Sequence, residues 1–301
     1  MDLINMDRRT FSKTLAGAAT LAATAGRSAS APDQNAPPFQ LSVMLWTVFR
    51  NLPFGQRLEK CIEAGYKNVE LVGEYGKWSE DEFSRNVAKA RELGVFFDTT
   101  AGLKHAVANP NDRDAFLADL QRELPIMERL NCPAVIVMSG NATPGMPRQI
   151  QHDSCIEGLK RAAALVEGKQ IAGQPVRLLL ENIDPEENPK YYLTSVAEGF
   201  EIVKAVNHPQ VQFLYDFFHE QIAEGNLIEK LEKNIQHTGL VHIADVPGRH
   251  QPGTGEINYE NIYRKLAELK YNRIAAMEFI PTGGPVEQLR LARETVFRCI
   301  A

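Results

Sequence analysis

Residues 211–244 read VQFLYDFFHEQIAEGNLIEKLEKNIQHTGLVHIA, and this stretch contains the building unit of the fold. It opens and closes with an apolar run of six residues, at 211–216 and 239–244. Short apolar runs bounded by turn residues are typical of buried strands in a parallel sheet. The segment between them has helical spacing, an Asn at its start and a Gly at its end, which are common helix boundaries. The stretch therefore predicts two parallel strands joined by a helical crossover.

The same unit repeats along residues 39–301. Amphipathic stretches such as SEDEFSRNVAKARELG, which begins like a capping box, separate the apolar runs. These runs are residues 41–46, 68–72, 95–100, 134–138, 176–182, 211–216, 239–244 and 274–279. Eight strands, each followed by a helix, in roughly 260 residues are typical of a (β/α)8 TIM barrel. A doubly wound sheet would usually carry a Gly-rich turn after its first strand, and MLWTVFRNLPFG has none. We predict an α/β protein with one barrel domain at 39–301.

The first 31 residues have the layout of an export signal peptide. Arg8 and Arg9 are followed by Phe11 and Lys13, then by a weakly apolar stretch that ends in the small residues 29–31. This order of charge, apolar core and cleavage pattern resembles a twin-arginine signal. An Ala-rich tail that happens to hold two arginines is the alternative. We predict a signal peptide at 1–31, a linker at 32–38 and a periplasmic location.

Composition narrows the class of partner. The chain has 301 residues, 44% hydrophobic and 24% charged, with a net charge of −5 and no block of Lys or Arg. This excludes an extensive basic surface for nucleic acid, and no apolar run approaches the roughly 20 residues that span a bilayer. We expect a small-molecule substrate and no stable membrane anchor, while a homo-oligomer remains open. Export would permit disulfides, but the four widely spaced cysteines fit small core residues better.

Ionisable residues stand at the ends of four consecutive predicted strands. The fifth strand ends in Glu181 and the sixth in Asp216, the seventh contains His242, and the eighth ends near Glu278. In a TIM barrel the carboxyl ends of the strands form the active site, so these side chains should meet. Three crowded carboxylates need a counter-charge, and no strand end supplies matching Lys or Arg residues. We predict one divalent metal ion, Mn²⁺, Mg²⁺ or Co²⁺, because the ligands are mainly oxygens with one imidazole. A web of salt bridges is the alternative.

The segments LLLENI, YDFFHEQI, VHIADVPGRHQPGTGEINY and MEF resemble hydroxypyruvate isomerases of the xylose isomerase-like barrel superfamily. The resemblance runs from about residue 40 to the end of the chain. It implies that Glu181, Asp216, His242 and Glu278 bind one metal and that Glu181 and Glu278 are the acid/base pair. It also implies that His219 contacts the substrate, and Glu187 matches another polar site residue of the related ketose 3-epimerases.

The loop after the seventh predicted strand supplies two further candidates. Its Gly and Pro residues indicate tight, stiff turns over the pocket. Arg249 is its one fixed cation, and we predict that it binds the anionic part of the substrate, with His250 as a weaker candidate. Arg249 paired with Asp245 or Glu256 to hold the loop in shape is the alternative. Trp46 fits either a pocket wall or the core.

Together these features predict an exported, metal-dependent isomerase that acts on a sugar or a hydroxy-keto acid through an enediolate. The closest expectation is hydroxypyruvate converted to tartronate semialdehyde. His242 departs from the Gln common in hydroxypyruvate isomerases and matches the ketose 3-epimerases, which stay an alternative. A phosphodiesterase of the endonuclease type would need a basic surface that the chain lacks. A non-catalytic carbohydrate-binding barrel would not need two opposed glutamates.

Overall fold

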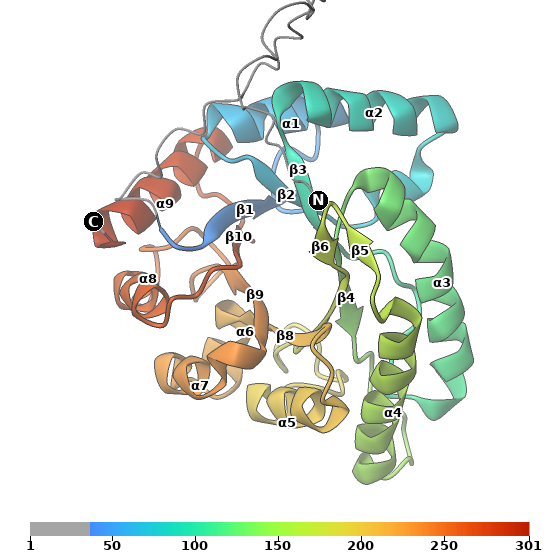
Figure 1. Ribbon diagram of the computed structural model, residues 1–301. Coiled ribbons are helices and arrows are strands. Elements are labelled where there is room, and N and C mark those ends of the chain that lie inside the picture. The colour runs from blue at the N-terminus through green and yellow to red at the C-terminus, as the bar shows by residue number, and fades with distance from the viewer. Residues whose placement is uncertain (1–36, 301) are drawn as a thin grey trace, which may run out of the picture. The chain divides into compact units, whose positions relative to one another are not determined.

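The computed structural model describes residues 37–300, and eight parallel strands close into a barrel within them (Figure 1). Neighbours around the barrel follow the order β1-β10-β9-β8-β7-β4-β3-β2, and β2 closes the ring against β1. The strands are β1 (Gln40–Met44), β2 (Asn68–Leu71), β3 (Phe96–Thr100), β4 (Ala134–Met138), β7 (Arg177–Glu181), β8 (Val211–Asp216), β9 (Thr238–Ile243) and β10 (Ile274–Met277). The TIM barrel prediction is confirmed, with each strand within the predicted run or one residue outside it.

Helices form an outer ring around the barrel (Figure 1). They are α1 (Phe54–Glu63), α2 (Glu80–Leu93), α3 (Arg113–Leu130), α4 (Arg148–Val166), α5 (Val196–Val206), α6 (Phe217–Ala223), α7 (Leu227–Asn234), α8 (Tyr259–Glu268) and α9 (Pro285–Ile300). The predicted capping box of α2 is present, since Ser79 and Glu82 bond to each other's backbone N–H. The crossover from β8 to β9 is two helices rather than one, because the backbone takes left-handed conformations at Gly225 and Asn226.

A two-stranded hairpin was not predicted. It consists of β5 (Gln170–Ile171) and β6 (Gln174–Pro175), and it precedes β7 at the amino-terminal end of the barrel (Figure 1). Ala172 and Gly173 take positive φ angles in its tight turn. Strands of two residues are too short to give an alternating pattern, so the sequence offered no signal for them.

Two apolar cores hold the barrel. The larger lies between the strands and the helices, and the smaller fills the barrel interior with Met44, Ile136, Leu179, Leu214 and Leu240 among its members. The interior also holds the acidic residues Glu70 and Asp98, which are 0% and 6% exposed. Burying carboxyl groups inside a barrel is costly, so their partners must be identified.

Several sequence predictions concern residues at the amino terminus or the cysteines. The predicted signal peptide and most of the linker lie outside the described residues. No helix in the described part is long and apolar enough to cross a membrane. All four cysteines are free; Cys61, Cys132 and Cys155 are buried and Cys299 is partly buried against the outer core. The cysteines therefore pack as small apolar side chains.

Candidate metal and acid–base site

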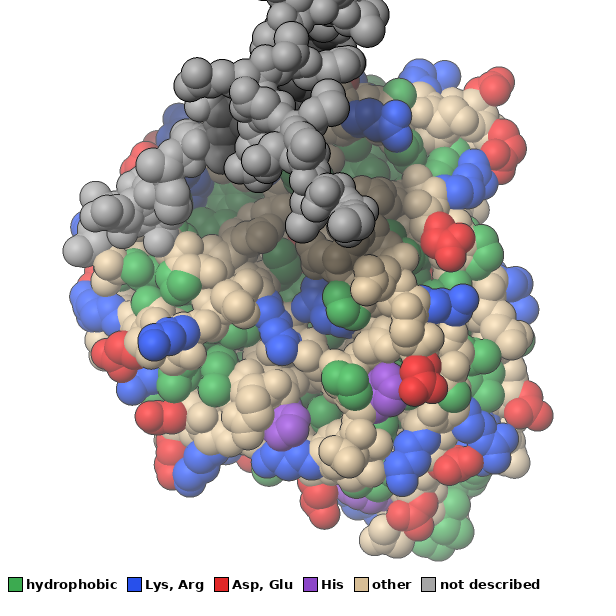
Figure 2. Space-filling model, in the orientation of Figure 1, with side chains coloured by type: hydrophobic (Ala, Val, Ile, Leu, Met, Phe, Trp, Pro, Cys, Tyr) green, Lys and Arg blue, Asp and Glu red, His purple; other side chains and the backbone are tan. Residues whose placement is uncertain are grey.

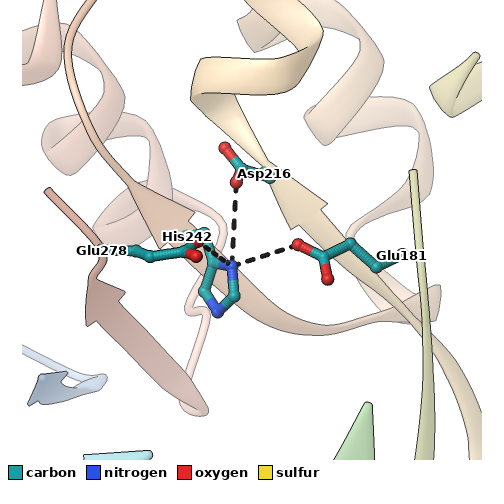
Figure 3. Close-up of side chains that lie close together, drawn as sticks. All are labelled: Glu181, Asp216, His242 and Glu278. Carbon is teal, nitrogen blue, oxygen red and sulfur yellow. Dashed lines mark ion pairs between the residues drawn. The ribbon is translucent and has the colours of Figure 1, made fainter. Parts of the chain in front are cut away.

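Four side chains from adjacent strands meet at the carboxyl end of the barrel (Figure 3). Glu181 ends β7, Asp216 ends β8, His242 lies in β9 and Glu278 follows β10. The parallel register pairs Asp216 with His242 and His242 with Ala276, so these strand ends share one level. One ligand atom from each of the four lies within 4.8 Å of the others, and all four residues are buried. The structure thus brings together the four residues predicted as metal ligands.

His242 stands at the centre of this cluster (Figure 3). Its Nδ1 lies 2.7 Å from Glu278 Oε2, 3.3 Å from Glu181 Oε1 and 3.7 Å from Asp216 Oδ2. Burial would lower the pKa of the ring, but the Glu278 and Glu70 carboxylates raise it well above its usual value. The imidazole nitrogen that faces the cluster is therefore surrounded by negative charge.

Glu70 orients the His242 ring through its second nitrogen, Nε2, and sequence reasoning missed this residue. Its Oε2 lies 2.9 Å from His242 Nε2, and both side chains are fully buried. A carboxylate at this position holds the proton on Nε2 and leaves the Nδ1 lone pair facing the cluster. The only signal in the sequence was an acidic residue inside the apolar run NVELV, which is unfavourable for a buried strand unless the residue has a partner.

The four candidate ligand side chains fit a divalent cation. Asp216 Oδ2, His242 Nδ1 and Glu278 Oε2 are buried atoms without a hydrogen bond to any described residue. Asp216 already uses Oδ1 to cap α6, where it accepts from the backbone N–H groups of Phe218 and His219. Buried polar atoms left unpaired and aimed at one point are costly, and a cation between them would remove that cost. Oxygen ligands with one imidazole are compatible with Mn²⁺ or Mg²⁺.

Glu181 and Glu278 differ in their hydrogen-bond donors. Glu278 Oε1 accepts from Trp46 Nε1 and from the Arg249 guanidinium, each at 2.8 Å. Burial would raise the pKa of Glu278, but Arg249 and His242 hold it at about 2. Glu181 Oε1 lies 3.3 Å from His242 Nδ1, and burial raises the pKa of Glu181. The two carboxyl groups are thus tuned in opposite directions, as an acid–base pair requires.

Arg249 points into the site from the loop after β9. Its guanidinium lies 5.4 Å from the Trp46 ring centroid and 4.9 Å from that of Phe218. One end of the guanidinium contacts Glu278, and the other donates to Glu187 Oε1 at 2.9 Å. Arg249 is 6% exposed, and burial opposes its charge, but Glu278 and Asp216 raise its pKa further. It therefore provides a fixed positive charge beside the four-residue cluster.

The loop itself is shaped by Asp245 rather than by Arg249. The two Asp245 carboxylate oxygens accept from five backbone N–H groups, those of Val246, Gly253, Thr254, Gly255 and Ile257. Glu256 accepts from Gln221 instead. The alternative in which Arg249 pairs with Asp245 or Glu256 is therefore wrong.

His219 and Glu187 form the remaining side of the site. His219 Nδ1 lies 2.6 Å from Asp184 Oδ2, and its Nε2 lies 3.5 Å from Asp216 Oδ2. Burial lowers the pKa of His219, but Asp216 and Asp184 raise it to about 9. Glu187 is exposed and reaches Arg249, and it adjoins a cleft of about 460 Å³ lined by Phe218, Pro247 and Gly248. Asp184, which sequence reasoning missed, fixes the ring of His219.

His250 does not join this group. Its Nδ1 lies 2.8 Å from the backbone carbonyl oxygen of Ile280, which ties the loop to the segment after β10. Its predicted contact with substrate has no support in this arrangement. Trp46, by contrast, contacts Glu278 directly and is a wall of the site.

Comparisons with known proteins identify the family and the fold. The model of a family described as xylose isomerase-like TIM barrel matches residues 58–296. A 2-oxo-tetronate isomerase of Pectobacterium atrosepticum is 30% identical over 78% of this chain and 90% of its own length. A putative hydroxypyruvate isomerase of Danio rerio is 29% identical over 85% and 95%. Among solved structures, a family 2 AP endonuclease from Brucella melitensis matches with a TM-score of 0.75 at 25% identity, covering 86% of this chain and 99% of that one.

Proposed function

This chain belongs to the xylose isomerase-like TIM barrel family and is an isomerase, and we propose that it moves a carbonyl group along a small α-hydroxy carbonyl acid. The nearest model reaction is hydroxypyruvate to tartronate semialdehyde. The observation that supports this best is the pair of buried glutamates on opposite sides of His242 (Figure 3). An isomerase of this kind removes a proton from one carbon and adds a proton to the neighbouring carbon. Two acid–base groups can share these steps, or a single group can perform both.

We propose that Glu181 accepts the first proton. Its raised pKa makes it the stronger base of the pair, whereas the Trp46 and Arg249 donors keep Glu278 ionised. Negative charge that develops on the substrate oxygens would be balanced by Arg249 and by protonated His219, both of which are buried and already fixed. His219 can also hand a proton to a substrate oxygen, because Asp184 keeps the ring in place.

The metal ion remains part of the proposal. Glu181, Asp216, His242 and Glu278 would hold Mn²⁺, Mg²⁺ or Co²⁺, with Glu70 orienting the imidazole. When bound, such an ion supplies positive charge that polarises a carbonyl oxygen and lowers the cost of the enediolate. The unpaired atoms of Asp216, His242 and Glu278 support this assignment.

The runner-up is a ketose 3-epimerase, which would use the same two glutamates on opposite faces of one carbon. His242 favours this reading, since the epimerases carry His at that position. The positive charge of Arg249 beside the cluster favours an acid, because it can balance a substrate carboxylate that a neutral sugar lacks.

Solvent deuterium incorporation tests the proposal. Metal-loaded protein is incubated in D₂O with hydroxypyruvate, a 2-oxo-tetronate, a tetrose and a ketohexose, and the products are followed by NMR. We expect deuterium at the original carbonyl carbon of the product acid, with its incorporation lost in Glu181→Gln. Exchange only at carbon 3 of the ketohexose would establish the epimerase instead. No exchange on any compound would refute both.

We also propose that the protein is exported folded by the twin-arginine route. Arg8 and Arg9 with the following Phe11 and Lys13 support this. Replacing both arginines by Lys should leave the precursor in the cytoplasm, while Arg27→Lys should not. Equal periplasmic amounts of the double variant and the unchanged chain would contradict the proposal.

A further inference from the structure

The amino-terminal mouth of the barrel holds a pocket that the proposed reaction does not use. It has a volume of about 300 Å³ and is lined by Gln40, Asn68, Asp98, Gln174, Arg177 and Arg273. Most of these residues lie at the beginnings of barrel strands, at the opposite end from the metal-ligand cluster, and Gln174 comes from the β5–β6 hairpin in front of them (Figure 1). Lys and Arg side chains lie near the middle of this face (Figure 2).

Two arginines meet in this pocket from different sides of the barrel. Arg177 begins β7 and donates from Nη1 to the carbonyl oxygen of Gly239 at 3.0 Å. Arg273 directly precedes β10 and donates from Nη1 to the carbonyl oxygen of Thr238 at 2.9 Å. These two carbonyls are consecutive at the start of β9, so both guanidinium groups are anchored at the same place. Each retains N–H donors beyond the one used for anchoring.

Within residues 37–300 neither guanidinium has an ion-pair partner. Both side chains are half-buried, and burial together with the nearby charge of Arg177 lowers the pKa of Arg273. The acid beside them is Asp98, which accepts from Ser42. Burial and the charge of Glu70 raise the pKa of Asp98 to about 8, which weakens its negative charge near neutral pH. The mouth therefore holds two guanidinium groups, and no ion pair among the described residues balances them.

We propose that this pocket binds a small dianionic oxyanion, a phosphate or a dicarboxylate, between Arg177 and Arg273. Paired guanidinium groups with free N–H donors suit the planar or tetrahedral oxygens of such groups. Side-chain amides of Gln40, Asn68 and Gln174 line the rest of the pocket and can bond a hydroxyl or carbonyl on the same ligand. The volume admits a compound of a few carbon atoms.

Calorimetric titration of the full metal-loaded chain with inorganic phosphate, and separately with malonate, tests this at constant ionic strength. We expect binding that Arg177→Gln combined with Arg273→Gln weakens at least 30-fold. Gln174→Glu removes no contact of either arginine. It should still weaken anion binding several-fold, because it adds a negative charge to the pocket. Gln149→Glu is the matched control on the exposed face of α4 and should leave the affinity unchanged.

Arg249→Gln separates this pocket from the metal-ligand cluster, where an anion could also bind. Binding that survives Arg249→Gln and is lost in the arginine double variant establishes the pocket. Comparable binding of malonate and phosphate assigns oxyanions generally, and binding of phosphate alone assigns phosphates. The proposal is overturned if neither anion binds, if Gln174→Glu has no effect, or if binding depends on Arg249 only.

Discussion

Glu70→Gln should weaken metal binding without unfolding the protein. The variant keeps the size of the side chain and can still accept from His242 Nε2, which lies 2.9 Å from the present carboxylate oxygen. It removes the negative charge that makes the imidazole a better ligand, and it leaves the four direct ligands in place. Glu70 is fully buried and its Oε1 has no described partner, so losing this charge also removes a desolvation cost.

The magnitude follows from this contact. Loss of a carboxylate behind a metal-bound histidine typically costs about 10- to 100-fold in metal affinity. That corresponds to about 1.4–2.7 kcal/mol, which is close to the value of one hydrogen bond to a charged group. We therefore expect the Kd for Mn²⁺ to rise by that factor, while the melting temperature of the metal-free protein holds or increases. Calorimetric competition against a chelator measures the Kd.

Asp98→Asn is the matched control. Asp98 is also an acidic residue buried inside the barrel, but it accepts from Ser42 and has no described contact with His242. The Kd of the Asp98→Asn protein for Mn²⁺ should stay within about threefold of the Kd of the unchanged protein. A Glu70→Gln protein that binds Mn²⁺ equally well, or an Asp98→Asn protein that loses as much affinity, would refute the reasoning.

Three further predictions concern the site itself. Glu181→Gln and Glu278→Gln should each lower kcat/KM at least about 100-fold. A variant of either residue that keeps more than a tenth of the original kcat/KM would contradict the acid–base roles. Arg249→Lys should lower kcat/KM at least about tenfold, because Lys lacks the guanidinium fork that spans two carboxylates. The melting temperature should not change. A lower melting temperature with unchanged kcat/KM would make Arg249 a structural residue. In metal-free protein the pKa of His219 is raised from 6.5 to about 9, so its stabilisation, on the order of 3 kcal/mol, is complete below pH 6.5 and lost as pH rises to 9. Thermal melts from pH 6 to 9.5 should show this decline, and His219→Gln should flatten it; equal slopes would exclude His219 as the cause.

The sequence predicted the barrel and the four strand-end residues because both depend on local patterns. Buried parallel strands are continuous apolar runs, so a Glu or Asp at the end of one stands out against its neighbours. Glu181 and Asp216 were visible in this way, and the fixed geometry of a TIM barrel then placed them together.

The contacts of the supporting residues could not be predicted because they reach across the barrel, and Trp46 was named only as a pocket wall or a core residue. Glu70 is 172 positions from His242 in the chain, and Trp46 is 232 positions from Glu278. Nothing in a local pattern indicates which distant side chain accepts a particular proton. The ion pairs of Arg249 with Glu187 and Glu278 were not predicted for the same reason, since both acidic residues lie outside its loop.

Asp245 holds its loop through backbone N–H groups, and this has a consequence for how the protein can change. The path of the loop is determined by five backbone N–H groups. Every residue type except proline supplies such a group. Gly255 is the position with the least freedom, because a Cβ there would lie 1.9 Å from the carbonyl oxygen of Val246. Gly248 and Gly253 take positive φ angles, and Arg249 belongs to the site, so these positions must be kept as well. Libraries that vary exposed loop positions such as Thr254 and Glu256 are therefore a practical route to new substrate preferences.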